Sequence, residues 1–220
     1  MSTHQAYDLV VQQLIPGYAS LARLAVALLA ASPLAGAEGA AVLVAGCGTG
    51  AELVEARSQR PDWALMAIDP SAEMLEAAQQ RLLGAPIQWQ RSTVEELQAD
   101  AAFAGALSVL VLQSLPDDGT KLAFLTALAR SLRPGGQLVL VDLMAPERSP
   151  LQQQVQQAWI GFQRASGLVA DSAALTPHLQ GLHPIGLARL TALVNAAGFS
   201  DPARVFQALS VEGFLLQRRD

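Results

Sequence analysis

The chain has 220 residues, 51% of them hydrophobic, and a formal net charge of −5 at pH 7, so we expect one globular domain over residues 1–220. The acidic balance argues against nucleic-acid binding, and no apolar run is long enough to cross a bilayer, so we expect a small-molecule substrate and no membrane partner. The single cysteine excludes an internal disulfide, and the start MSTHQAYD lacks the features of an export signal, so a cytoplasmic location is expected.

Two helices are predicted ahead of the first strand, over about residues 5–32. The first carries apolar residues at helical spacing and is interrupted by Pro16-Gly17. The second begins near Tyr18 and repeats leucine and alanine on one face, which is typical of a helix that packs on a sheet. From its position alone, Tyr18 reads as an aromatic side chain that anchors this helix to the sheet.

A strand that runs into a glycine-rich turn is the main motif of the chain. Residues 42–45 are small or β-branched and apolar, Gly46, Gly48 and Gly50 alternate in the turn, and residues 51–57 begin a helix. Glycines allow a ligand to approach the backbone closely, and the start of a helix offers unpaired N–H groups. The turn therefore either binds a nucleotide-like ligand or is only a tight turn, and its spacing also satisfies a loose dinucleotide fingerprint.

The second strand, residues 63–69, ends on a carboxylate. An acid at the carboxyl end of this strand can accept hydrogen bonds from both hydroxyls of a ribose, so Asp69 indicates a nucleoside ligand. Asp-Pro-Ser is also good chemistry for the start of a helix, with Ser71 as the N-cap. The two roles of Asp69 are compatible.

Strands and helices continue to alternate after this point. Three further strands are predicted at residues 87–90, 106–112 and 137–143, and residues 205–209 with 214–217 predict a closing hairpin. The expected fold class is α/β, with a doubly wound, Rossmann-like, seven-stranded and mostly parallel sheet that ends in an antiparallel hairpin.

Several polar residues are expected at the carboxyl edge of this sheet. Gln113 and Ser114 follow the fourth strand and are candidates for substrate or cofactor contact. Asp142 lies near the end of the fifth strand but has no visible partner in the sequence. No Ser-His-Asp order and no metal-ligand cluster is recognisable, so no metal is expected.

From Leu151 the alternation gives way to a glutamine-rich helix and then to irregular sequence. We expect a helical insertion over about residues 147–185 that covers the site. It is either a lid or an interaction helix. An interaction helix would be compatible with a homodimer. His178 and His183 lie in the irregular part. They are either ordinary surface histidines or an imidazole base for an acceptor hydroxyl.

Three motifs together resemble the class I S-adenosylmethionine-dependent methyltransferases: GCGTG at residues 46–50, AIDPS at 67–71 and LRPGGQLVLVD at 132–142. The resemblance covers roughly residues 40–145 and implies S-adenosyl-L-methionine as the cofactor. It implies that the glycine turn wraps the methionine portion, that Asp69 holds the ribose, and that the leading helices fold over the cofactor. The implied cofactor contacts are Tyr18, Gly46, Cys47, Gly48, Gly50, Asp69, Pro70, Thr93, Val94 and Val109.

The chain departs from that family at two positions. Most relatives carry an acid two residues before the first glycine, where this chain has Val44. The loop after the third strand usually supplies an acid for the adenine amino group, and the residues best placed here are Ser92, Thr93 and Val94. Thr93 offers a hydroxyl or a backbone contact instead, and Glu95 is near enough to be a substitute.

A second, patchier resemblance runs almost end to end. QQLIPGYASLARL, LVLQSLPDD, FQRASGL and AAGF are similar to carboxy-S-adenosylmethionine synthases, which use prephenate as carboxyl donor in a tRNA wobble-uridine pathway. The arginine that those enzymes use for the extra carboxylate should fall near Leu175, where there is none, and an asparagine of their fourth strand is replaced by Val109. We therefore expect methyl transfer to a small acceptor by direct displacement. The alternatives are carboxyl transfer to the cofactor and a cofactor-binding module without catalysis.

Overall fold

The computed structural model describes residues 3–168 and 181–220, with side chains from Asp8 onward. Its centre is a seven-stranded sheet in the order β3-β2-β1-β4-β5-β7-β6. The strands are β1 (Ala41–Ala45), β2 (Ala64–Ile68), β3 (Ile87–Gln90), β4 (Phe103–Val109), β5 (Leu132–Leu143), β6 (Ala203–Ala208) and β7 (Val211–Gln217). The first five are parallel and β7 is antiparallel to both of its neighbours, which confirms the predicted fold class.

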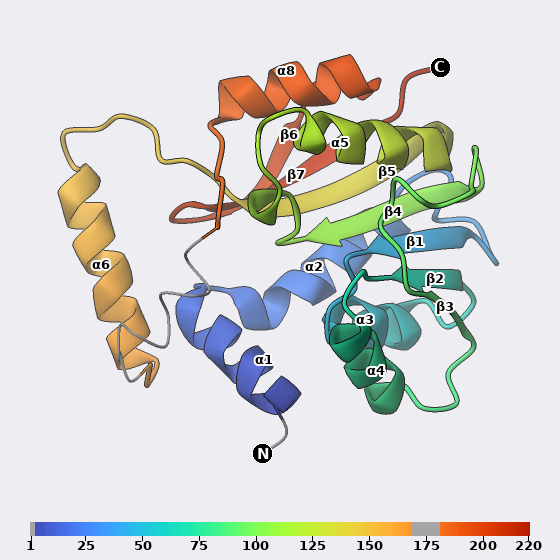
Figure 1. The fold of residues 1–220 in the computed structure, drawn as a ribbon, viewed down its shortest axis with the longest axis horizontal. Coiled ribbons are helices and arrows are strands. Elements are labelled where there is room, and N and C mark those ends of the chain that lie inside the picture. Colours follow the sequence, from blue (N-terminus) through green and yellow to red (C-terminus); the bar gives the residue numbers. More distant parts are fainter. Residues whose placement is uncertain (1–2, 169–180) are drawn as a thin grey trace.

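Helices cover both faces of the sheet (Figure 1). On one face lie α5 (Thr120–Ser131) and α8 (Leu187–Ala197), whose apolar residues share one buried cluster. On the other lie α2 (Tyr18–Ala30), α3 (Ala51–Gln59) and α4 (Ala72–Arg81), which contribute to a second cluster. The strands between them are buried on both faces, which explains their nearly continuous apolar sequence.

Several strand boundaries differ from the prediction, most clearly those of the fourth and fifth strands. The fourth strand was expected at residues 106–112 but spans Phe103–Val109, and the fifth begins at Leu132 and not near residue 137. Leu110 has a positive φ of 60°, which a strand does not accommodate. The apolar residues after Val109 are buried or half-buried without belonging to the sheet, and periodicity alone does not distinguish the two cases.

The N-terminal part consists of two helices joined at a sharp bend. Helix α1 (Thr3–Leu14) meets α2 at 94°, at a break that contains Gly17 with a φ of 80°. In the described part of the chain no single helix is long and apolar enough to span a membrane; only this bent pair reaches the threshold, when the two helices are counted together.

Helix α6 (Gln152–Ala165) stands beside α1, away from the sheet (Figure 1). Its Trp159 donates a hydrogen bond from Nε1 to the carbonyl of Leu14, at 2.7 Å. This helix belongs to the insertion that the sequence places over the site. The rest of the insertion includes residues 169–180, which lie outside the described residues.

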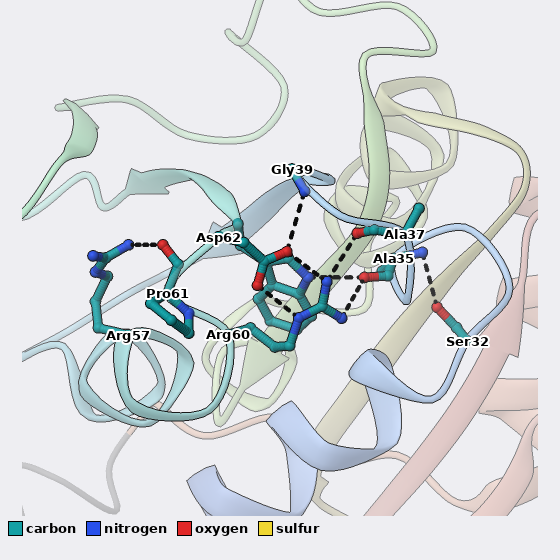
Figure 2. Close-up of polar contacts among 9 residues, drawn as sticks. Ser32, Ala35, Ala37, Gly39, Arg57, Arg60, Pro61 and Asp62 are labelled. Carbon is teal, nitrogen blue, oxygen red and sulfur yellow. Dashed lines mark hydrogen bonds and ion pairs between the residues drawn. The ribbon is translucent and has the colours of Figure 1, made fainter.

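A guanidinium ties the linker before β1 to the start of β2 (Figure 2). Arg60 donates to the carbonyls of Ala35 at 3.1 Å and Ala37 at 2.8 Å, and pairs with Asp62 at 2.7 Å. Its guanidinium also lies 5.1 Å from the ring centroid of Trp63. These contacts lie at the end of the sheet where β1 and β2 begin.

Candidate functional site

The strand order reverses between β1 and β4, because β2 and β3 follow on one side and β5 on the other. In open α/β sheets, ligands bind outside the carboxyl ends of the strands at such a point. The glycine turn that follows β1 and the segment that follows β4 therefore lie at the expected binding edge.

The glycine turn needs its glycines for conformation and for space. Gly46, Gly48 and Gly50 have φ values of 70°, 50° and 84°, in the left-handed region that favours glycine. A Cβ atom on Gly46 would lie 2.4 Å from Cγ2 of Val111, so the segment after β4 packs directly on the turn. A Cβ on Gly48 would meet nothing within 4 Å, so this side of the turn is open to a ligand.

Asp69 joins the glycine turn to the next helix, which agrees with its predicted role at the start of that helix. Its Oδ2 accepts a hydrogen bond from the Gly48 N–H and its Oδ1 accepts one from the Ser71 N–H, each at 2.9 Å. Ser71 is the N-cap of α4, and its hydroxyl accepts from the Met74 N–H. Each carboxylate oxygen keeps a further acceptor site for a hydroxyl.

Cys47 is a buried thiol within the turn. Burial, with Asp69 and Glu52 nearby, raises the pKa of Cys47 to about 12. The side chain is therefore uncharged at neutral pH and is not a nucleophile. The side chain packs within the second apolar cluster.

A polar contact from α1 reaches the same turn, which the sequence did not reveal. The carboxylate of Asp8 accepts from the Thr49 hydroxyl at 2.5 Å and pairs with Arg81 at 3.0 Å. No pattern in the sequence connects these three residues, because they come from α1, the turn and α4. Their contact places α1 against the glycine turn.

The loop after β3 holds the residues proposed for the adenine. Thr93 donates its N–H to Glu96 Oε2 at 3.0 Å, and the side chain of Val94 is buried in the apolar cluster. The hydroxyl of Ser92 is buried and has no hydrogen-bond partner among the described residues. Pro70 is exposed, and its carbonyl accepts from Arg91.

The other sequence candidates lie at several places around the edge. Tyr18 begins α2, half-buried against the second apolar cluster, and Val109 ends β4 against the same cluster. Gln113 has a structural role, because its Oε1 accepts from the Leu143 N–H at 2.9 Å. Ser114 is exposed.

Of the two histidines proposed as a base, only one lies in the described residues. The side chain of His183 is exposed, and its backbone N–H donates to the carbonyl of Gln113 at 2.6 Å. His178 falls outside the described residues. Among the residues that the structure describes, no group of three His, Cys, Asp or Glu side chains is placed to hold a metal ion.

Two buried charged groups lie behind the edge. Asp142 is 2% exposed and accepts hydrogen bonds from the N–H groups of Leu112 and Gln113, both at 2.8 Å. Lys121 is fully buried and donates from Nζ to the Leu112 carbonyl. Burial raises the pKa of Asp142 to about 7, although these hydrogen bonds and Lys121 act in the opposite direction. Burial also disfavours the charged form of Lys121, and for this basic group it lowers the pKa.

The buried carboxyl groups of Glu52 and Asp142 should make the free energy of unfolding depend on pH. Burial raises the pKa of Glu52, like that of Asp142, to about 7. An acid with a raised pKa in the folded state binds its proton more tightly there than in the unfolded chain, so stability increases as the pH falls through 7. Between pH 8 and pH 6 each group should add about 1 kcal/mol to the free energy of unfolding.

Urea denaturation at several pH values measures this slope. Glu52→Gln removes one of the two groups and should reduce the gain in stability between pH 8 and pH 6 by about 1 kcal/mol. Lys121 acts in the opposite sense, but it is present in both proteins and its contribution cancels in the comparison. An unchanged slope in Glu52→Gln would contradict the raised pKa.

Comparison with known proteins finds similarity to methyltransferases. Residues 42–136 match a family described as a methyltransferase domain. An uncharacterized methyltransferase of Mycobacterium bovis is 34% identical over 106 residues, which are 48% of this chain and 51% of that protein. The trans-aconitate 2-methyltransferase of Azoarcus sp. is 37% identical over 117 residues, 51% of this chain and 42% of that protein. The chain thus spans about half the length of the curated relatives that it matches.

Solved structures share the fold over more of the chain. The 1,6-didemethyltoxoflavin-N1-methyltransferase of Burkholderia thailandensis, solved with 1,6-didemethyltoxoflavin and S-adenosylhomocysteine, has a TM-score of 0.65 at 21% identity, over 99% of this chain and 84% of that chain. Human N-acetylserotonin methyltransferase, solved in complex with S-adenosylmethionine, has a TM-score of 0.59 at 18% identity, over 82% and 48% of the two chains. At these identities the likeness concerns the fold alone.

Proposed function

We propose that this protein is a class I S-adenosylmethionine-dependent methyltransferase that transfers a methyl group to a small-molecule acceptor, because residues 42–136 match a methyltransferase domain. The observation that carries the proposal is the direct hydrogen bond between Gly48 and Asp69, which brings the glycine turn and the predicted ribose-binding acid together in this domain. The cofactor that the family implies is S-adenosyl-L-methionine.

The residues at the edge fit this cofactor. The open side of Gly48 leaves room for a ligand against the backbone, and Asp69 retains acceptors for two ribose hydroxyls. The buried Ser92 hydroxyl lies in the loop after β3, beyond Asp69 in the strand order, where it can bind a polar atom of the base. The absence of an acid from this loop is therefore compatible with cofactor binding.

When bound, S-adenosyl-L-methionine supplies a methyl group on a positively charged sulfur for direct displacement. The acceptor atom is the nucleophile and S-adenosylhomocysteine is the leaving group, so the chain has to hold the reactants in line and exclude water, and it needs no nucleophile of its own. Helix α1, placed on the turn by Asp8, and the start of α2 at Tyr18 are the elements positioned to limit solvent access.

A small acceptor is supported by the relatives. The names trans-aconitate 2-methyltransferase and 1,6-didemethyltoxoflavin-N1-methyltransferase both specify small-molecule acceptors. The net charge of −5 also favours a small molecule over nucleic acid. A cytoplasmic location and a homodimer remain proposals from the sequence.

Two measurements test the function. Isothermal titration with S-adenosylhomocysteine should show binding, and incubation with methyl-labelled cofactor and a metabolite extract should give a labelled small product. Absence of binding at millimolar S-adenosylhomocysteine would reject the cofactor. Binding without any labelled product would favour a module without catalysis, and a cofactor mass gain that requires prephenate would favour carboxyl transfer.

Asp8→Ala tests the contact between α1 and the turn. The side chains of Asp8 and Arg81 are 25% and 40% exposed, so the free energy of unfolding should change by no more than about 1 kcal/mol. Loss of the hydrogen bond to Thr49 frees the turn, and the Kd for S-adenosylhomocysteine should rise roughly threefold to tenfold. Titration calorimetry measures this rise.

The matched control is Glu55→Ala. It breaks another partly exposed ion pair between helices, Arg23 with Glu55 at 3.5 Å, that does not touch the turn. Its Kd should equal that of the unmodified protein. Equal affinities for all three proteins would show that α1 does not support the cofactor site.

A further inference from the structure

The segment after β4 is held by two buried ionisable side chains that bind the backbone of one residue, Leu112. Asp142 Oδ2 accepts from the N–H of Leu112 at 2.8 Å, and Lys121 Nζ donates to the carbonyl of the same residue. Asp142 Oδ1 also accepts from the N–H groups of Gln113 at 2.8 Å and Leu143 at 3.1 Å. The backbone at Leu112 is therefore fixed from both ends and tied to the end of β5.

Leu112 lies directly after Val111, the residue that packs on the glycine turn. The Cγ2 atom of Val111 is so close to Gly46 that no Cβ atom would fit between them. A small movement of Leu112 would move Val111, and the turn would lose the surface against which it packs. Leu110, with its positive φ, begins this segment and donates its N–H to the Val141 carbonyl at 2.7 Å.

Stability alone does not explain the two charges. Buried opposite charges cost desolvation energy, and well-packed apolar residues of similar volume often stabilise a protein more. Lys121 is fully buried on the same face of α5 as Phe124, Leu125 and Leu128, where an apolar side chain would be expected. The pair has a geometric consequence that an apolar pair would lack, because it binds the backbone of Leu112, Gln113 and Leu143.

We propose that Asp142, together with Lys121, is a positioning residue for the cofactor site: it holds residues 110–112 against the glycine turn in the shape that binds an adenosyl ligand. This inference rests on the proposed function. Asp142 itself touches neither ligand nor acceptor in this role; it acts through Leu112 and Val111.

Three variants separate positioning from stability. Asp142→Asn replaces one carboxylate oxygen with an amide NH₂ group, which cannot accept a hydrogen bond from the backbone, so it should be destabilised. Asp142→Asn with Lys121→Met also removes the buried ammonium group and should recover part of the lost stability, so that the double variant folds and can be titrated. Ser131→Ala is the control, since it deletes a buried hydroxyl that donates to the Leu128 carbonyl at the opposite end of α5.

Calorimetric titration with S-adenosylhomocysteine gives the decisive comparison. The folded double variant should bind at least about tenfold more weakly than the unmodified protein, because Leu112 and Gln113 still lack their carboxylate acceptor. Ser131→Ala should bind with unchanged affinity. In the ligand-free double variant, hydrogen exchange at the amides of Gln113 and Leu143 should be faster than in Ser131→Ala.

The outcomes distinguish this inference from the proposed function. If the unmodified protein fails to bind S-adenosylhomocysteine, the proposed function is rejected, and the positioning role is rejected with it. If the unmodified protein binds and the folded double variant binds equally well, only the positioning role is rejected. Unchanged exchange at both amides would also overturn it, whatever the protein binds.

Discussion

Asp69→Ala should raise the Kd for S-adenosylhomocysteine about 100-fold or more. A hydrogen bond to a charged group contributes about 1.5–3 kcal/mol, and Asp69 is positioned to accept two from the ribose. The substitution also leaves the N–H groups of Gly48 and Ser71 without their acceptor, so the turn is less well ordered. Calorimetric titration at neutral pH measures the change.

Asp62→Ala is the matched control, because Asp62 precedes β2 at the opposite end from Asp69. It too accepts from a backbone N–H, that of Gly39 at 3.1 Å, and it pairs with Arg60. Its removal should loosen the linker before β1 and leave ligand affinity unchanged. If Asp69→Ala binds within threefold of the unmodified protein, the ribose assignment is wrong.

Gly46→Ala should lower the free energy of unfolding by roughly 2–5 kcal/mol. A left-handed backbone conformation costs an alanine about 1–2 kcal/mol, and overpacking adds about 1–3 kcal/mol, because the new Cβ meets Val111 at 2.4 Å. Urea denaturation measures the loss. Affinity for S-adenosylhomocysteine should fall as well, since the turn and the segment after β4 can no longer pack in the same way.

Gly48→Ala separates backbone strain from collision. Its φ of 50° implies a similar strain of about 1–2 kcal/mol, but its Cβ would meet nothing within 4 Å. We expect a smaller loss of stability than for Gly46→Ala and a marked loss of ligand affinity, because the Cβ would occupy the side open to the ligand. Unimpaired binding by Gly48→Ala would place the ligand elsewhere.

The sequence predicts those parts of the candidate site that are formed by residues close together in the chain. The glycine turn and Asp69 were recognisable because each lies at the end of an apolar strand, and parallel strands bring their carboxyl ends to one edge. The N-cap role of Ser71 was also predicted, because a helix cap depends only on residues within one helical turn.

Other parts of the site gave a weaker signal or none. Lys121 lies three and four residues before Phe124 and Leu125, so its place on the buried stripe of α5 could have been noticed. The contact of Asp8 with Thr49 left no trace, because it depends on the angle at which α1 returns over the sheet. Gln113 was expected to contact a ligand, but its side chain binds the Leu143 backbone.

By itself, the sequence determined the doubly wound sheet, the closing hairpin, the glycine turn after β1 and the position of Asp69 at the end of β2. The hydrophobic period and the conformation of glycine are local properties of the sequence. The order of the strands follows from general rules of topology for alternating strands and helices. Only the tertiary structure decided which side chains support the turn from behind: Asp8, Val111, Lys121 and Asp142 come from separate elements. Their contacts depend on how those elements pack, and residue spacing along the chain does not encode such packing.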